Sequence, residues 1–278
     1  MPELPEVETI RFQLEKYIVG SVIKEIEVKN KKYDIDSEQV LGKKIIGVRR
    51  FAKQLSIDLE NNYSIMIHVK MTGQLVYEGE KLKKTKSQKL SSKVIGGLGG
   101  KHTHLIFHLD DGDLYYNDVR QFGWIKVVKN EELKAIVFAP EPLKDLTAEH
   151  FIDLLSKSKR NIKVMLMDQS KIGGVGNIYA NDALWLSKIS PKRMSNSLTS
   201  QEATLLFKSI ETVLKAGLKY GGASELAFVT PDGKEGEYQN HSLVYGHTNE
   251  ICQSCKKNKV EKFFLGGRGT YWCKFCQK

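Results

Sequence analysis

Apolar and polar residues follow two different periods along this chain. Residues 6–18 carry apolar side chains at intervals of three and four, which is typical of an amphipathic helix. From about residue 22 to residue 128 the period shortens, and β-branched residues gather in short alternating or apolar runs. The clearest runs cover residues 22–28, 55–59, 104–109 and 124–128. The pattern predicts a helix followed by an antiparallel β-sandwich or barrel.

The second half of the chain has a helical period. After a Pro-Glu-Pro break at 140–142, apolar spacing predicts helices at about 147–157, 161–169, 177–186 and 200–220. A glycine-rich turn, IGGVGN at 172–177, joins the middle two helices. Residues 221–250 have little periodicity and contain several glycines, so we expect a long loop there. Long loops inside compact domains are often functional.

The four cysteines form two CxxC pairs near the end of the chain, with 17 residues between the pairs. Each CxxC brings two thiolates onto one tight turn, and this spacing is typical of a four-cysteine zinc site. The alternative, a pair of redox motifs, lacks the surrounding βαβ pattern. We therefore expect one structural Zn²⁺ with no open position for a catalytic water. Its ligands are Cys252, Cys255, Cys273 and Cys276.

Composition narrows the class of protein. The 278 residues are 41% hydrophobic and 27% charged, which supplies enough apolar material for folded cores, and the length favours two domains. No apolar run approaches the roughly 18 residues that span a bilayer. The acidic N-terminus lacks the regions of a signal peptide. We therefore expect a cytoplasmic protein without a membrane partner.

A formal net charge of +10 suggests a polyanionic partner. Basic runs without acids occur at 43–53 and 157–163, and residues 251–278 hold seven basic residues against one acid. Runs in both halves favour a nucleic-acid-binding cleft over separate solvated faces. Residues 81–101 hold seven lysines and no acid. They predict either a solvated surface loop or an arm that approaches DNA.

The first residues allow a chemical and a structural interpretation. Removal of the initiator methionine would leave the secondary amine of Pro2, and an α-amino group is partly neutral and nucleophilic near pH 7. Attack on a sugar C1′ would give an iminium, for which Glu3 and Glu6 supply an acid and a stabilising anion. A helix also starts with proline and acids in its first turn. These residues by themselves favour the helix start.

Four segments together resemble the formamidopyrimidine-DNA glycosylase family, in the right order over essentially the whole chain. They are MPELPEVET at 1–9, GVGNIYA at 174–180, VYG at 244–246 and GGRGTYWCKFCQK at 266–278. Members of this family are bifunctional glycosylases and AP lyases of base excision repair. The resemblance implies an α+β fold with DNA lying between its domains. The expected parts are an N-terminal β-sandwich catalytic domain at 1–140, a helix-two-turn-helix DNA-binding domain at 141–245 and a zinc-bound β-hairpin at 246–278.

The resemblance also reverses the interpretation of the N-terminus. It implies Pro2 as the Schiff-base nucleophile, Glu3 as the proton donor in glycosylic cleavage, and Glu6 as a supporting acid. Lys53 resembles the lysine that acts in β-elimination. Arg268 resembles the hairpin arginine that grips phosphates and assists δ-elimination.

Contacts to DNA are implied for a second group of residues: His68, His102, Lys159, Lys163 and the phosphate-binding Asn177. Met71, Arg120 and Phe122 resemble the trio that enters the base stack when a damaged nucleotide is flipped out. Inserted side chains replace the lost stacking and pairing. Without the resemblance, Met71 and Phe122 would be assigned to core packing.

The chain departs from the family pattern at three places. Asp182 stands where the family's NIYxxE motif has Glu, and we expect this change to affect helix packing rather than chemistry. The 81–101 segment is longer and richer in lysine than usual. Residues 224–226 do not map onto lesion contacts, which leaves lesion preference open.

The resemblance predicts a monomeric enzyme that removes oxidised purines, including 8-oxoguanine and formamidopyrimidines, from double-stranded DNA and cleaves abasic sites by β,δ-elimination. In a bacterium it would associate with the nucleoid. An endonuclease VIII-like glycosylase for oxidised pyrimidines would share Pro2 and Glu3, but Leu4 favours the purine enzyme. A non-catalytic zinc-ribbon DNA-binding protein would have lost Pro2 or Glu3, and both are present.

Overall fold

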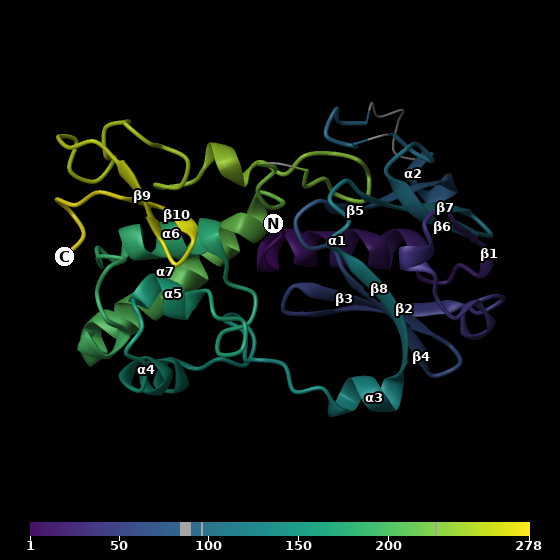
Figure 1. Cartoon of the computed structure of the whole chain (residues 1–278), viewed down its shortest axis with the longest axis horizontal. Helices are drawn as coiled ribbons and strands as arrows, with labels where there is room; N and C mark the ends of the chain where they lie inside the picture. Colours follow the sequence, from purple (N-terminus) through teal and green to yellow (C-terminus); the bar gives the residue numbers. More distant parts are fainter. Residues whose placement is uncertain (84–89, 96, 226) are drawn as a thin grey trace. The chain divides into compact units, whose positions relative to one another are not determined.

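The computed structural model describes residues 1–83, 90–95, 97–225 and 227–278. The described chain divides into two units, shown in Figure 1: the first contains residues 1–137 and 220–237, and the second contains 138–219 and 238–278. The break near residue 138 lies close to the expected boundary at 140. Residues 220–237, which the sequence analysis places in the helical domain, pack with the first unit. The cysteine-rich C-terminus packs within the second unit.

The described part of the first unit contains helix α1 and two four-stranded antiparallel sheets (Figure 1). Helix α1 (Leu4–Ile18) buries its apolar face, which includes Val7, Ile10 and Leu14. One sheet has the order β1 (Ile23–Val28), β6 (Thr103–Leu109), β7 (Gly112–Asp118), β5 (Gly73–Gly79). The other has the order β2 (Ile45–Phe51), β3 (Gln54–Leu59), β4 (Tyr63–His68), β8 (Trp124–Lys129).

One apolar core draws side chains from α1 and from both sheets, for example Ile10, Leu55 and Phe107. This arrangement follows from the alternating pattern, because each strand directs every second side chain to the same face. The predicted helix and strands are therefore confirmed in type and place. Two short helices, α2 (Glu80–Lys83) and α3 (Asn130–Ala135), follow strands β5 and β8.

Helices and a β-hairpin make up the second unit. The helices are α4 (Ala148–Ser156), α5 (Ile162–Leu166), α6 (Asn177–Leu186) and α7 (Ser200–Lys219), and the hairpin pairs β9 (Glu261–Leu265) with β10 (Arg268–Trp272). Helices α4, α6 and α7 agree with the predicted ranges within one residue, whereas α5 ends at Leu166, three residues before the predicted end at 169. Gly217 allows α7 to approach α6, because a Cβ atom there would come 2.5 Å from the Tyr179 hydroxyl. No helix in the described residues is long and apolar enough to cross a membrane.

Candidate active site and nucleic-acid interface

The N-terminal residues are buried at the start of α1. Glu3 is the N-cap residue and is only 2% exposed, and Pro2 is buried beside it. The Glu6 carboxylate accepts a hydrogen bond from the Glu3 backbone N–H at 2.7 Å, which forms half of a capping box. The structural and the chemical interpretations of this segment are therefore compatible. The helix start holds in place the residues for which the family resemblance implies a chemical role.

A distant loop completes the surroundings of Glu6. The backbone N–H of Ala223 donates to the second oxygen of this carboxylate at 2.8 Å, although the two residues are 217 positions apart. Gly222 adopts a φ of +85°, and a Cβ atom at this position would lie 2.8 Å from Glu6 Cγ. Glycine is therefore required here both for conformation and for close approach. The sequence motif indicated a role for Glu6 but contained no signal for its hydrogen bond with Ala223.

Lys53 lies in a two-residue turn between β2 and β3, where Phe51 pairs with Gln54. Its side chain is 5% exposed, and the preceding Ala52 adopts a φ of 51°. The guanidinium of Arg50 donates to the Ala52 carbonyl at 2.9 Å and to Glu8 on α1 at 2.7 Å. Arg50 therefore fastens the turn that carries Lys53 to the helix that carries Pro2 and Glu3.

His68 ends strand β4 and is held in one tautomer. Its Nδ1 accepts a hydrogen bond from the backbone N–H of Lys70 at 3.0 Å, so the ring proton lies on Nε2. Burial, and then the positive charges of Lys70 and Lys53, lower the pKa of His68 to about 4. The imidazole is therefore neutral near pH 7 and offers an N–H donor. The effect of the Lys53 charge on the pKa of His68 indicates that the two side chains lie near each other.

The three residues expected to enter the base stack come together on two neighbouring loops. The Arg120 guanidinium lies 4.6 Å from the centre of the Phe122 ring, and its Nη1 lies 3.3 Å from the sulfur of Met71. Phe122 is 53% exposed. An apolar ring of this size at the surface does not serve core packing, which removes the alternative that the sequence left open for Phe122.

A buried carboxylate that the sequence analysis did not identify organises these two loops. Asp118 is 1% exposed and accepts hydrogen bonds from Thr72 Oγ1 at 2.5 Å and from the Gly123 N–H at 2.8 Å. Thr72 Oγ1 also accepts the Arg120 N–H at 3.1 Å. His102, an expected DNA contact, is half-buried, and its carbonyl accepts the Asp118 N–H at 2.9 Å. The Asp118 carboxylate thus binds the residue that follows Met71 and the residue that follows Phe122.

In the second unit, the glycine turn delivers Asn177 to the first position of α6. Gln169 holds the turn in shape: its amide donates to the Val175 carbonyl at 2.7 Å and accepts the Gly174 N–H at 3.1 Å. A helix N-terminus presents unpaired N–H groups and the positive end of the helix dipole, which together suit a phosphate. Asn177 is half-buried and stands at that end.

The four cysteine sulfurs lie within 4.8 Å of one another. Cys252 and Cys276 are 3.9 Å apart, as are Cys255 and Cys273. Four thiolates in a tetrahedron around zinc, with Zn–S bonds of about 2.3 Å, would lie roughly 3.8 Å apart. Backbone N–H groups lower the pKa of Cys255 to about 6, whereas burial raises the pKa of Cys276 to about 12. The donor set therefore fits Zn²⁺ closely, and Trp185 Nε1 donates to the Cys252 sulfur at 3.4 Å.

The β9–β10 hairpin turns through two glycines, Gly266 and Gly267, with φ values of 56° and 71°. A two-residue turn with two positive φ angles is a type I′ turn, whose twist suits a hairpin. Arg268 follows directly and is exposed.

The two lysines expected to contact DNA differ in their surroundings. Lys163 is completely buried, and its ammonium donates to the Gly269 carbonyl at 2.9 Å and to Thr270 Oγ1 at 2.7 Å. This lysine therefore supports the hairpin that carries Arg268 and is not available for a direct contact to DNA. Lys159, four residues earlier, is exposed.

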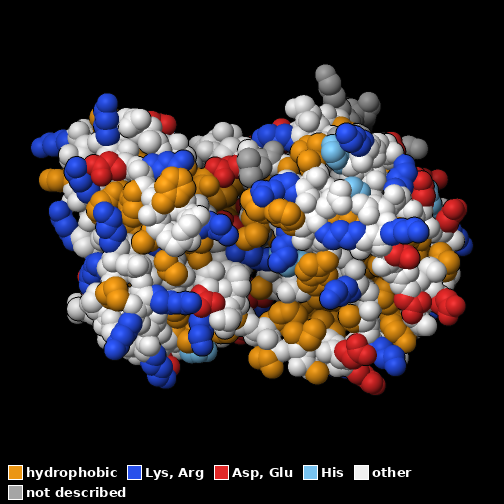
Figure 2. Space-filling view, viewed as in Figure 1, with side chains coloured by type: hydrophobic (Ala, Val, Ile, Leu, Met, Phe, Trp, Pro, Cys, Tyr) orange, Lys and Arg blue, Asp and Glu red, His pale blue; other side chains and the backbone are white. Residues whose placement is uncertain are grey.

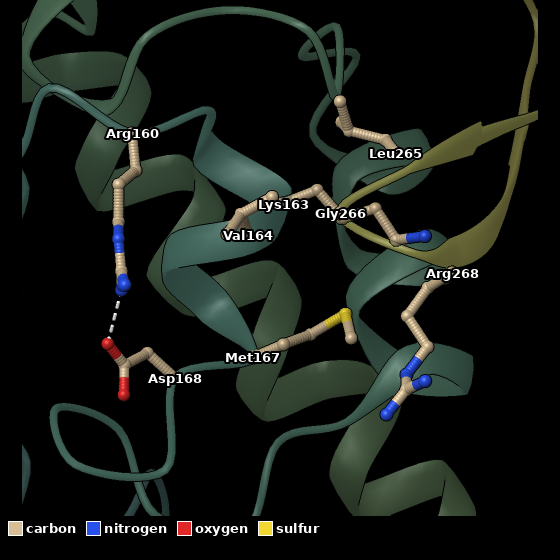
Figure 3. Close-up of a pocket in the computed structure, with 8 residues that line it drawn as sticks. All are labelled: Arg160, Lys163, Val164, Met167, Asp168, Leu265, Gly266 and Arg268. Atoms are coloured by element: carbon tan, nitrogen blue, oxygen red, sulfur yellow. Dashed lines mark hydrogen bonds and ion pairs between the residues drawn. The ribbon is translucent and has the colours of Figure 1, made fainter.

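A pocket of about 310 Å³ lies between this hairpin and the segment from residue 160 to residue 168 (Figure 3). The Arg268 side chain extends from the hairpin beside Met167, while Arg160 forms an ion pair with Asp168. Figure 2 shows Lys and Arg side chains spread over the second unit with few acidic groups between them. The lining of the pocket is Arg160, Lys163, Val164, Met167, Asp168, Leu265, Gly266 and Arg268.

Asp182, the departure from the family motif, is completely buried. Burial raises its pKa, and donors from one loop offset part of that rise. The backbone N–H groups of Leu243, Val244 and Tyr245 donate at 2.9 to 3.0 Å, and the Tyr238 hydroxyl donates at 2.9 Å. Aspartate is therefore long enough to hold this loop. The expected effect on helix packing is replaced by binding of the loop backbone.

Two family models match the chain: the formamidopyrimidine-DNA glycosylase N-terminal domain over residues 1–125 and the corresponding H2TH domain over residues 138–228. The chain belongs to the formamidopyrimidine-DNA glycosylase family. Among similar proteins, the formamidopyrimidine-DNA glycosylase of Carboxydothermus hydrogenoformans is 37% identical, and that of Pediococcus pentosaceus is 38% identical. The alignments cover 100% of this chain and 100% and 99% of these relatives.

Solved structures agree with this membership. The Lactococcus lactis Fpg in complex with DNA containing N7-benzyl-Fapy-dG superposes with a TM-score of 0.86 at 33% identity, over 100% of both chains. The same protein with DNA containing an abasic site gives 0.85 at 34% identity, over 99% of both chains. The family resemblance and the α+β fold class predicted from the sequence are therefore confirmed.

Proposed function

We propose that this protein is a base-excision repair DNA glycosylase for oxidised purines, with the AP lyase activity of its family. The observation that carries the proposal is the constellation at the start of α1. Pro2 and Glu3 are buried there, Glu6 caps the helix, and Arg50 fastens the turn of Lys53 to the same helix. Helix capping by itself accounts for these carboxylates, so the support for catalysis is their combination with Pro2 and with the buried Lys53.

The chemistry begins after removal of Met1. The Pro2 nitrogen attacks C1′ of the flipped nucleotide, a new N–C1′ bond forms, and the bond from C1′ to the base breaks. Glu3 supplies the proton that the departing base requires. The C1′–O4′ bond then breaks, and the proton released by the attached nitrogen goes to O4′, so that the opened sugar carries an iminium at C1′. The resulting iminium acidifies C2′, so loss of a proton breaks the strand on the 3′ side, and a second elimination leaves a one-nucleotide gap. Lys53 assists β-elimination, and Arg268 holds the phosphate that leaves in δ-elimination.

The remaining residues bind and shape the DNA. Asn177 at the start of α6 and the exposed Lys159 contact phosphates, while neutral His68 and nearby His102 donate hydrogen bonds close to the lesion. Met71, Arg120 and Phe122 fill the space that the flipped nucleotide vacates. When bound, Zn²⁺ supplies folding energy to the hairpin and takes no part in the reaction. The protein works as a monomer in the compartment that holds the DNA.

Borohydride reduction tests this proposal directly, because it converts the iminium into a stable amine. We expect a covalent complex with duplex containing 8-oxoguanine, and peptide mapping should locate the link at residue 2. A link on any lysine would contradict the assignment of Pro2. The Glu3→Gln variant should keep DNA binding and lose base excision, whereas an unchanged excision rate would remove Glu3 from the mechanism.

Oxidised pyrimidines form the second candidate class of substrate. The structurally similar Lactococcus lactis Fpg was also crystallised with DNA containing an oxidised pyrimidine. Excision of 8-oxoguanine and of thymine glycol, measured side by side in otherwise identical duplexes, separates the two classes. We expect faster excision of 8-oxoguanine.

A further inference from the structure

Residues 90–95, in the described part of the lysine-rich segment, pack against residues 224–225 and 227–235 within the first unit. The ammonium of Lys93 forms an ion pair with Glu235 at 2.6 Å and donates to the carbonyl of Ser224. The Ser91 hydroxyl donates to the other oxygen of Glu235 at 2.6 Å. The hydrogen bond from Lys93 is the main cause of a lowered pKa at Glu235. Lys93 is therefore engaged by its own chain.

The buried side-chain amide of Gln74 also binds both segments. Gln74 on β5 is 1% exposed, and its side chain donates to the carbonyls of both Lys93 and Ala227. Its Oε1 accepts the N–H of Ile95 at 3.3 Å. Polar groups at this depth are costly unless their partners stay in place, so Gln74 requires both segments to keep their positions.

Apolar and backbone contacts extend this interface. Val94 packs with Val76 of β5 and with Val229 of the loop. The Ser91 N–H donates to the Gly233 carbonyl at 2.9 Å. Gly233 also has a φ of +74°, and a Cβ atom there would lie 2.2 Å from a methyl group of Leu90. The two segments therefore interlock through side chains and backbone along most of their length.

The residue that Lys93 contacts, Ser224, is the chain neighbour of the residue that binds Glu6. Ser224, whose carbonyl binds Lys93, directly follows Ala223, whose N–H donates to the Glu6 carboxylate at 2.8 Å. The Ser224 hydroxyl stiffens this point, because it accepts the Gly236 N–H at 2.9 Å and donates to the Phe228 carbonyl at 2.7 Å. Movement of Ser224 would thus shift the donor on which Glu6, and through it the Glu3 backbone, depends.

We propose that residues 90–95 are a clasp that holds the loop residues 222–225 and 227–235 against Glu6, and that Lys93 is a positioning residue for the catalytic N-terminus. The proposal rests on the function proposed above. It assigns the described end of the lysine-rich segment to preorganisation of the site rather than to attraction of phosphates. Preorganised groups lower the barrier because little rearrangement remains for the reaction step.

The test compares two lysines of the same segment. Lys93→Met removes the clasp's ammonium. Lys81→Met is the matched control, because Lys81 pairs with Asp111 at 2.8 Å and donates to Ser21 Oγ at 3.2 Å, and neither partner belongs to the loop. Both changes remove one positive charge. In single-turnover excision at saturating enzyme we expect Lys93→Met to be slower by about tenfold, which corresponds to about 1.4 kcal/mol of barrier, and Lys81→Met to match the wild type. Lys93→Arg should restore most of the rate.

KM should stay near the wild-type value in the Lys93→Met variant, because a positioning role acts on the bound state. Equal rates for both methionine variants, or an equal loss of DNA affinity without a change in rate, would overturn the clasp. Hydrogen exchange gives a second readout that needs no substrate. The amides of Ala223 and Gly236 should exchange faster in Lys93→Met, and unchanged protection would also overturn the proposal.

Two further controls keep the outcomes distinct. Glu235→Gln removes the ion pair while keeping the shape of the side chain, and it replaces Lys93→Met if that variant fails to fold. We expect the same slower excision and faster amide exchange. Wild-type protein that excises no oxidised purine would refute the proposed function itself, whereas active wild type with unaffected variants would refute only the clasp.

Discussion

At the scale of single residues, this protein uses buried charged groups to hold backbone. The carboxylate of Glu6 accepts backbone N–H groups from Glu3 and Ala223, and Asp182 accepts three from residues 243–245. Lys163 is a buried cation and acts as a donor instead: its ammonium donates to the Gly269 carbonyl of the hairpin. Buried charges are costly unless their hydrogen-bonding capacity is met. Each therefore specifies one arrangement of chain around it.

Two lysines of one basic run give contrasting predictions. Lys163→Met should destabilise the protein by about 1–3 kcal/mol, because the Gly269 carbonyl and the Thr270 hydroxyl lose a buried donor. Lys159→Met, at an exposed site, should change stability by less than about 0.5 kcal/mol. Urea unfolding measures both values. Equal stability of the two variants would contradict the structural role of Lys163.

The same pair should separate in DNA binding. If Lys159 contacts a phosphate, Lys159→Met reduces the slope of log affinity against log salt by about 1, because one counterion fewer is released. Affinity measured from about 50 to 200 mM salt gives this slope. An unchanged slope would mean that Lys159 does not reach the DNA.

His68 gives a prediction for pH dependence. Its folded pKa of about 4 lies below the unfolded value near 6.5, so the unfolded chain binds the proton first as pH falls. The contribution of His68 to stability is therefore fully present above about pH 6.5 and is lost as pH falls toward 4. NMR titration of the ring should find it neutral down to pH values near 4. A midpoint near 6.5 would contradict the buried, neutral imidazole.

Among the elements, short loops at the ends of strands carry residues that we propose contact DNA, and buried polar groups fix those loops. Asp118 at the end of β7 binds Thr72 and Gly123, which flank the trio. Gln169 plays the same part for the turn before α6. Functional loops on a rigid scaffold need such supports, because their own side chains point outward and stabilise little.

Replacement of Asp118 tests this arrangement. In Asp118→Asn, an amide N–H₂ faces a donor that formerly met a carboxylate oxygen, so we expect a loss of about 1–3 kcal/mol in unfolding free energy and slower excision. Asp113→Asn is the control, since this carboxylate is 34% exposed beside His108. It should lose much less stability. Wild-type stability and activity in Asp118→Asn would show that the loops hold their positions without it.

At the scale of the whole molecule, two units stabilise themselves by different means. The first buries a large apolar core between α1 and two sheets, whereas the C-terminal hairpin packs on a small cluster around Cys252 and Cys273. A short hairpin is marginally stable without further support. The four cysteines supply that support once a metal joins them.

Metal removal should therefore affect the units unequally. Protein purified without chelator should contain one Zn²⁺ per chain, and Cys273→Ser should lower both metal content and DNA affinity by displacing Arg268. The first unit should stay folded, because its core contains no cysteine in the described residues. A metal assay, DNA titration and circular dichroism check these outcomes. Zinc-free protein with full DNA affinity would contradict the metal site.

The main elements and the family could be predicted from the amino-acid sequence. Hydrophobic periodicity is local, so the main helices and the four clearest strands could be predicted from their own residues, and the cysteine spacing indicated the metal site for the same reason. The N-terminal motif likewise named Pro2, Glu3 and Glu6 through the family resemblance. Their distances from one another along the chain are short, and their chemistry needs no distant partner to be recognised.

Residues that look alike in the sequence could be told apart only in the folded structure. Lys159 and Lys163 are indistinguishable in a basic run, yet one is exposed and the other is buried under the hairpin. Ala223 reaches Glu6 across 217 positions, and Lys93 turns to Glu235 instead of to solvent. The physical reason is common to all three: their partners come from distant segments, and a local pattern contains no information about which segments packing brings together.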